Sequence, residues 1–161
     1  MDLTYTAEQN EFRARLRAWL ERNVPPMDPA AVVSGSEAEV GFLREWQRQL
    51  YDAGWCGLTW PVEYGGRGAS PIEEAIYSEE MARAQAPELI NRVGVNNVGP
   101  TLIRHGTDEQ KRRFLSKILS AEEIWCQLFS EPGAGSDLAA LRTRAERDGD
   151  GFRLTGQKVW T

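Results

Sequence analysis

The sequence predicts a mainly α-helical protein whose final segment changes to short β-strands. Helix-capping signals precede several stretches in which apolar residues recur every three or four positions. Towards the end of the chain, apolar and polar residues alternate instead, on either side of a turn made of Asp and Gly. We therefore expect an N-terminal helical bundle followed by the first strands of a β-domain.

The first expected helix begins after Thr6, because Thr6 and Gln9 form a capping box that satisfies free N–H groups at a helix start. The helix ends before Pro25 and Pro26. Its apolar face is formed by Phe12, Leu16, Trp19 and Leu20. Residues 27–35 show no periodicity and are expected to form a loop.

Three further helices have capping signals of the same kind. These signals are Ser36 with Glu39, Ser70 with Pro71 and Glu73, and Thr107 with Gln110. One more helix is expected at residues 93–104, where Gly99 and Pro100 predict a bend or a close contact. Residues 55–69 are rich in Gly and Pro, and we expect Trp55 and Trp60 to pack this connector down.

Three strands are expected in the last part of the chain. Residues 125–130 alternate in polarity and predict a short strand. Residues 142–147 and 152–160 predict a hairpin, because Asp148-Gly149-Asp150-Gly151 between them is a strong turn signal. Two such short strands do not form a stable sheet alone, so we expect the sequence to be a part of a longer one.

Composition argues against several classes of function. The net charge is -5 with a pI near 5.0, and no basic run stands out, which argues against a nucleic-acid partner. No apolar stretch approaches the roughly 18 residues that a membrane span needs, and no signal peptide is recognisable, so we expect a cytoplasmic protein. Cys56 and Cys126 are expected to be small buried residues, and His105 a structural residue at a helix end. We expect no metal site.

A Gly- and Pro-rich loop joins the helical part to the strands. Pro132 ends the expected strand, and Gly133 and Gly135 permit either a sharp turn or the close approach of a bound group. Ser136 and Asp137 then leave polar groups at the end of the loop. Such a loop can direct several N–H groups and a hydroxyl at one ligand, or it can be an ordinary turn.

The loop and three other segments resemble the acyl-CoA dehydrogenase family. Residues 130–137, Ser-Glu-Pro-Gly-Ala-Gly-Ser-Asp, are similar to its flavin and thioester loop, and residues 156–161, Gly-Gln-Lys-Val-Trp-Thr, resemble its second flavin motif. Residues 57–66 look like a loop of its helical domain, and residues 104–111 look like its helix-loop-helix before the flavin strand. Family members are more than twice as long. The resemblance thus implies a helical domain at 1–122 and the beginning of the middle β-domain at 123–161.

The resemblance also implies an activity and a set of site residues. Members use FAD to remove hydrogen from the α and β carbons of an acyl-CoA thioester. The residues implied to contact the flavin are Gln127, Leu128, Phe129, Ser130, Trp160 and Thr161. Ser136 is implied to contact the CoA part of the substrate. The catalytic base of the family is a Glu from a region with no counterpart here, so no catalytic residue is assigned and we expect this segment alone to be inactive.

Two other interpretations remain open. The chain could be a non-catalytic truncated paralogue, or an assembly partner subunit of a heteromeric acyl-CoA dehydrogenase. It could also be an unrelated helical domain in which the glycines serve only as turns. If the resemblance holds, the implied partners are an acyl-CoA substrate, an electron-transferring flavoprotein or similar acceptor, and further subunits of a homo- or hetero-oligomer.

Overall fold

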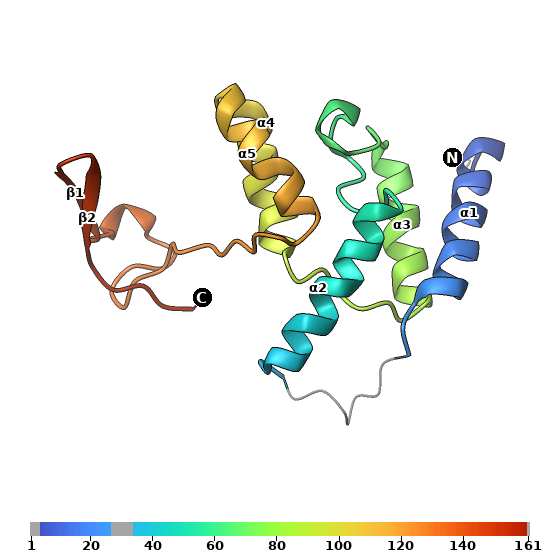
Figure 1. Ribbon diagram of the computed structural model, residues 1–161, viewed down its shortest axis with the longest axis horizontal. Coiled ribbons are helices and arrows are strands. Elements are labelled where there is room, and N and C mark those ends of the chain that lie inside the picture. The colour runs from blue at the N-terminus through green and yellow to red at the C-terminus, as the bar shows by residue number, and fades with distance from the viewer. Residues whose placement is uncertain (1–3, 27–33, 161) are drawn as a thin grey trace. The chain divides into compact units, whose positions relative to one another are not determined.

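The computed structural model describes residues 4–26 and 34–160 of the 161-residue chain. Its internal contacts separate two compact units, which we call unit 1 (Met1–Trp125) and unit 2 (Cys126–Thr161). Unit 1 is helical and unit 2 holds a two-stranded sheet, as Figure 1 shows. The predicted mainly α-helical fold with short strands at its end is therefore confirmed. Most of the loop expected at 27–35 lies outside the described residues.

Five α-helices build the described part of unit 1. They are α1 (Ala7–Asn23), α2 (Glu37–Asp52), α3 (Pro71–Arg83), α4 (Gly99–His105) and α5 (Asp108–Leu119). Two short helical turns lie between them, the 3-10 turn η1 (Val62–Tyr64) and the π-helical turn η2 (Gly94–Val98). α1 packs against α3, and α4 packs against α5 (Figure 1).

The helix starts follow the capping signals of the sequence. Thr6, Ser70 and Thr107 each form a complete capping box. Ser36 also caps its helix, because its hydroxyl accepts a hydrogen bond from the N–H of Glu39. The Glu39 carboxylate, however, accepts from the N–H of Gly35 at 2.6 Å, so this fourth cap is not a box of the predicted kind.

The core of unit 1 is formed by side chains from all parts of its sequence. Its buried members are Phe12, Leu16, Leu20, Trp46, Leu50, Trp55, Cys56, Leu58, Trp60, Ile76, Val95, Leu115, Ile118 and Leu119. Trp46 is among the largest fully buried side chains, and its Nε1 donates to the carbonyl of Pro87 at 2.8 Å. Burial of a Trp with its N–H satisfied gives the apolar contact without the cost of an unpaired donor.

Two buried amide side chains, Gln47 and Asn91, bind the end of α5. The Gln47 amide donates to the carbonyls of Ile118 and Leu119, at 3.1 and 3.0 Å. The Asn91 amide donates to the carbonyls of Ile118 and Glu123, at 2.9 and 2.8 Å, and its oxygen accepts from the N–H of Trp125 at 2.8 Å. This network satisfies carbonyls that a helix end leaves free, and it fixes the last residues of unit 1.

The connector between α2 and α3 is packed down as expected. Trp55 and Trp60 are buried, and Trp60 Nε1 donates to the carbonyl of Val95 at 3.0 Å. A Cβ at Gly99 would lie 1.9 Å from the Trp60 ring, so only glycine allows this approach. The close contact predicted at Gly99 is therefore confirmed, and the helix expected at 93–104 is divided there into η2 and α4.

Unit 2 contains an antiparallel hairpin of β1 (Arg144–Asp148) and β2 (Gly151–Thr155). Asp148 pairs with Gly151, which leaves Gly149 and Asp150 as a two-residue turn, and Gly149 has a φ of 62°. The predicted turn is confirmed, whereas the predicted second strand was too long, since β2 ends at Thr155.

The strand expected at residues 125–130 is not formed. An alternating sequence becomes a strand only where a neighbouring strand supplies hydrogen-bond partners along its length. Here Val159 N–H donates to the carbonyl of Ser130 at 3.0 Å, and Glu131 forms an isolated bridge with Ala134. No further strand lies beside this stretch in the described part of unit 2, so it stays irregular.

Candidate functional site

The Gly- and Pro-rich loop forms a tight turn at its start. Glu131 and Ala134 exchange two backbone hydrogen bonds, of 2.8 and 3.1 Å, around Pro132 and Gly133. Neither Gly133 nor Gly135 has a positive φ, and a Cβ added at either position would meet no described atom within 4 Å. The turn itself therefore does not require glycine at these two positions.

The candidate flavin residues before the turn are open to solvent in the structure. Gln127, Leu128 and Phe129 are exposed, with Phe129 at 55%, and Ser130 is half-buried. Trp160 is 92% exposed and has a φ of 63°, an uncommon conformation for an aromatic residue. Large exposed aromatic side chains on irregular backbone have contact area to offer a ligand or another polypeptide.

The structure brings two of the candidate segments together. The hydrogen bond from Val159 N–H to the Ser130 carbonyl places the residue before Trp160 beside Ser130. Ser136 lies exposed on the loop after the turn. Thr161, the sixth flavin candidate, lies outside the described residues.

A buried carboxylate, which the sequence did not single out as a site residue, lies behind this loop. The side chain of Glu131 is 7% exposed. It accepts hydrogen bonds from the N–H groups of Arg142 and Thr143 at 2.7 and 2.9 Å, and from Lys158 Nζ at 2.9 Å. Hydrogen bonds from Thr143, Arg142 and Lys158 lower the pKa of Glu131 to about 2. A carboxylate with so low a pKa is a poor base, so Glu131 is not a candidate for proton abstraction.

Unit 2 also has a cavity of about 330 Å³ beside this carboxylate. Its lining consists of Glu131, Pro132, Gly133, Ala140, Arg142, Thr143, Gly156 and Gln157. The residues from both motifs thus share one hollow.

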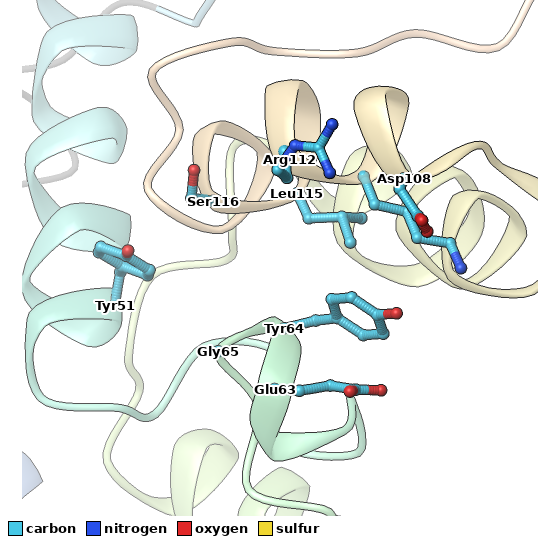
Figure 2. A pocket seen from close by; sticks show the side chains of 9 residues that line it. Tyr51, Glu63, Tyr64, Gly65, Asp108, Arg112, Leu115 and Ser116 are labelled. Carbon is cyan, nitrogen blue, oxygen red and sulfur yellow. The ribbon is translucent and has the colours of Figure 1, made fainter.

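Unit 1 has its own surface pocket, of about 400 Å³, between η1 and α5. Figure 2 shows Glu63 and Tyr64 of η1 opposite Asp108 and Leu115 of α5. Acidic and basic groups are balanced around it, since Lys111 and Arg112 accompany the two carboxylates. None of the candidate flavin or substrate residues lines this pocket in the described structure, although its lining includes residues of the segments 57–66 and 104–111.

The other residues that the sequence raised as possible sites have structural surroundings. Cys56 is buried, and burial raises the pKa of its thiol to about 12, which keeps it unreactive. Cys126 is exposed, so the expectation that both cysteines are buried was wrong. Cys126 lies on irregular backbone, and no strand packs beside it in the described part of the chain. His105 lies in the last turn of α4, as expected. Across the described residues, no cluster of His, Cys, Asp and Glu could hold a metal ion, and no helix is long and apolar enough to cross a membrane.

Comparison with known proteins defines the class. The model of the acyl-CoA dehydrogenase N-terminal domain matches residues 6–122. The chain therefore belongs to the acyl-CoA dehydrogenase family, and the resemblance seen in the motifs is confirmed.

Individual relatives match almost the whole chain and not only its helical domain. Acyl-CoA dehydrogenase IpdE1 of Mycobacterium tuberculosis is 46% identical over 155 residues, which are 94% of this chain and 40% of the relative. The crystal structure of the ChsE4-ChsE5 complex from the same organism matches with a TM-score of 0.84 at 42% identity, over 100% of this chain and 40% of that chain. The Tcur3481-Tcur3483 steroid ACAD matches with a TM-score of 0.80 at 42% identity, over 99% and 41%. The chain thus spans about 40% of the length of these relatives.

Proposed function

We propose that this chain forms the N-terminal part of an FAD-dependent acyl-CoA dehydrogenase, which removes hydrogen from the α and β carbons of an acyl-CoA thioester. The observation that carries the proposal is the pairing of Ser130 with Val159, because it joins the two segments that the family resemblance assigns to the flavin. Unit 2 would then be the beginning of the middle β-domain.

The residues present fit a bound flavin. Gly133 and Gly135 have open space where a Cβ would stand, although the turn does not need them, so their value lies in letting a ligand approach the backbone closely. The exposed side chains of Phe129 and Trp160 offer apolar surface. Bound FAD supplies the redox chemistry as a hydride acceptor.

The chain's own residues would bind and orient the reactants. Gln127, Leu128, Phe129, Ser130, Trp160 and Thr161 would hold the flavin, with the Ser130 hydroxyl as a hydrogen-bond donor to its polar edge. Ser136 would bind the CoA part of the thioester. We assign no base within this chain, so the segment alone would not oxidise acyl-CoA, and it would bind FAD weakly. Stoichiometric yellow FAD on the purified 161-residue chain would contradict that expectation.

The two serines permit a direct test of these assignments in the whole protein. Ser130→Ala should weaken FAD binding or slow flavin reduction by about 1 to 3 kcal/mol, because a buried acceptor loses its donor. Ser136→Ala should raise the apparent dissociation constant for acyl-CoA, and so weaken its binding, and should leave the flavin spectrum unchanged. Both variants are titrated with FAD and then with an acyl-CoA, and the flavin absorbance is followed. If Ser136→Ala loses flavin and Ser130→Ala binds the substrate poorly, the two assignments are reversed. If both variants behave like the parent, the loop has only a structural role.

The related structures suggest which acyl-CoA substrate should be tested first. One matching structure is titled a steroid ACAD, so we propose a thioester with a bulky, steroid-like acyl group as the first candidate. Dye reduction by the whole protein is compared between such a thioester and a linear acyl-CoA of similar carbon number. Preference for the linear substrate would contradict this assignment.

A second candidate function is that of a subunit in a heteromeric dehydrogenase. Two of the matching structures are titled as pairs of differently named proteins. Copurification of a second dehydrogenase-like chain, with FAD bound only to the pair, would support this role. An active homo-oligomer would exclude it. The electron-transferring flavoprotein as acceptor and the cytoplasmic location remain predictions.

A further inference from the structure

We infer that Glu131 is a positioning residue that holds the two proposed flavin segments in one geometry before any ligand binds. The inference rests on the proposed function of these segments, and it concerns the chain's own hydrogen bonds. Glu131 would contact neither the flavin nor the substrate.

The carboxylate connects three parts of unit 2 that are far apart in sequence. Its oxygens accept from the N–H groups of Arg142 and Thr143, just before β1, and from Lys158 Nζ, in the second motif. Lys158 Nζ also donates to the carbonyl of Phe129 at 3.0 Å. Glu131 and Lys158 therefore link the first motif, the start of the hairpin and the second motif.

Few other contacts join these segments in the described part of unit 2, one being that of Gly156 with Thr143, where an added Cβ would lie 2.2 Å from the Thr143 hydroxyl. The regular sheet contains β1 and β2 alone, and both strands are exposed along their whole length. Between the two motifs the backbone contributes the hydrogen bond from Val159 N–H to the Ser130 carbonyl. A single backbone hydrogen bond contributes little to stability, so the charged contacts have to provide most of the connection.

The burial of the two charged groups suits this role. The side chain of Glu131 is 7% exposed and that of Lys158 is 21% exposed, so their contact is shielded from solvent more than an ordinary surface ion pair. The low pKa of Glu131 keeps the carboxylate charged across the physiological range. A buried carboxylate with three donors is costly to disturb, since removal of its charge leaves those donors without a strong acceptor.

The test uses the whole protein as its gene encodes it, with any subunit that copurifies. Glu131→Gln keeps the size of the side chain but removes its charge, and Lys158→Met removes the opposite charge. Glu146→Gln is the matched control, because Glu146 is an exposed carboxylate on β1. The reporter is hydrogen exchange of the Val159 amide, which touches Ser130 and not Glu131.

We expect Val159 exchange to accelerate at least tenfold in Glu131→Gln and in Lys158→Met, and to stay at the parent rate in Glu146→Gln. A local role of Glu131 would change only the Arg142 and Thr143 amides. In a parallel titration, FAD affinity should fall by about 10- to 100-fold in the first two variants. The visible spectrum of the remaining bound flavin should shift.

The outcomes separate this inference from the proposed function. Parent-like Val159 exchange in both Glu131→Gln and Lys158→Met overturns the inference, as does equal FAD affinity in the parent and these variants. A parent that binds no FAD overturns the proposed function instead. In that event accelerated Val159 exchange still supports Glu131 as the residue that connects the segments.

Discussion

Unit 1 and unit 2 use their apolar residues in opposite ways. In unit 1 most of the large apolar side chains are buried or packed against the core, and the indole N–H groups of Trp46 and Trp60 donate to backbone carbonyls. In unit 2, Leu128, Phe129, Phe152, Leu154 and Trp160 are exposed, and the best-buried groups are Ala134 and the carboxylate of Glu131. Unit 1 is thus stabilised by its own core, whereas unit 2 is held by turns and by hydrogen bonds to one charged group.

The comparison explains why the proposed ligand residues belong to unit 2. Exposed apolar and aromatic groups are available for a ligand or another polypeptide, while buried ones have already been used in packing. If this contrast holds, substitutions in the core of unit 1 should cost far more stability than substitutions in unit 2.

The largest effect is expected from truncation of the core of unit 1. Trp46 is 1% exposed, and Trp46→Ala should reduce the free energy of unfolding by about 3 to 5 kcal/mol through the cavity it leaves. The matched change in unit 2, Phe152→Ala, removes a side chain that is 64% exposed and should cost less than about 0.5 kcal/mol. Urea unfolding followed by far-UV circular dichroism measures both. Equal losses would contradict the proposed difference between the units.

The next effect concerns the buried polar network of unit 1. Asn91→Asp keeps the shape of the side chain but removes the amino group that donates to the carbonyls of Ile118 and Glu123. Two buried acceptors then face a carboxylate, so we expect a loss of about 2 to 4 kcal/mol. Asn97→Asp, at an exposed position in η2, is the control. The carbonyls of Ile118 and Glu123 should repel the new carboxylate and displace it, so the amide of Trp125, which donates to Asn91 Oδ1, should exchange faster in Asn91→Asp alone. An unchanged Trp125 amide would show that the network does not fix the end of unit 1.

A third effect depends on pH and involves Glu80 of α3. Its side chain is only 3% exposed and forms an ion pair with Arg17 of α1. Hydrogen bonds from Arg17 and Arg83 lower the pKa of Glu80 from 4.5 to about 2, and they outweigh burial, which alone would raise this pKa. The group therefore stabilises the fold above about pH 5, and this contribution is lost as the pH falls through the range between the two pKa values.

Glu80→Gln should accordingly reduce the free energy of unfolding by roughly 1 to 3 kcal/mol at pH 7, because the arginines lose a charged acceptor. The difference from the parent should shrink as the pH falls from 5 to 2. Glu79→Gln is the control, since the Glu79 side chain is 56% exposed. Urea unfolding at several pH values measures this difference, and a constant difference between pH 7 and pH 2 would refute the role given to Glu80.

The same contrast separates what the sequence could predict from what it could not. Helix starts depend on side chains within three residues of one another, so Thr6, Ser70 and Thr107 were sufficient to predict three capping boxes. The hairpin turn is equally local. The strand expected at 125–130 failed because strand formation depends on a neighbour, and alternation alone does not supply one.

The candidate site divides in the same way. Its motif residues could be named from the order of amino acids alone, but the contacts of Glu131 join positions up to 27 residues apart. A sequence pattern gives no distance between such positions. The one available signal was a charge of opposite sign in each motif, Glu131 in the first and Lys158 in the second. The Gln47 and Asn91 network was missed for the same reason, since its members are 44 residues apart.

The smallest effect is expected at the hairpin of unit 2. Gly149 has a φ of 62° at the first position of the two-residue turn, where a primed hairpin turn needs a positive φ. A Cβ there meets no described atom within 4 Å, so Gly149→Ala tests backbone conformation without crowding. We expect a local cost of about 1 kcal/mol. Because unit 2 has little core of its own, that cost should speed amide exchange across β1 and β2 about fivefold, while the urea midpoint of unit 1 stays unchanged.

The control is Gly133→Ala. A Cβ at Gly133 also meets no described atom within 4 Å, but Gly133 has no positive φ, so this change should leave the exchange of the hairpin amides as it is in the parent. A shift of the unit 1 midpoint in Gly149→Ala would mean that the two units unfold together, and the contrast between them would then not extend to their stability.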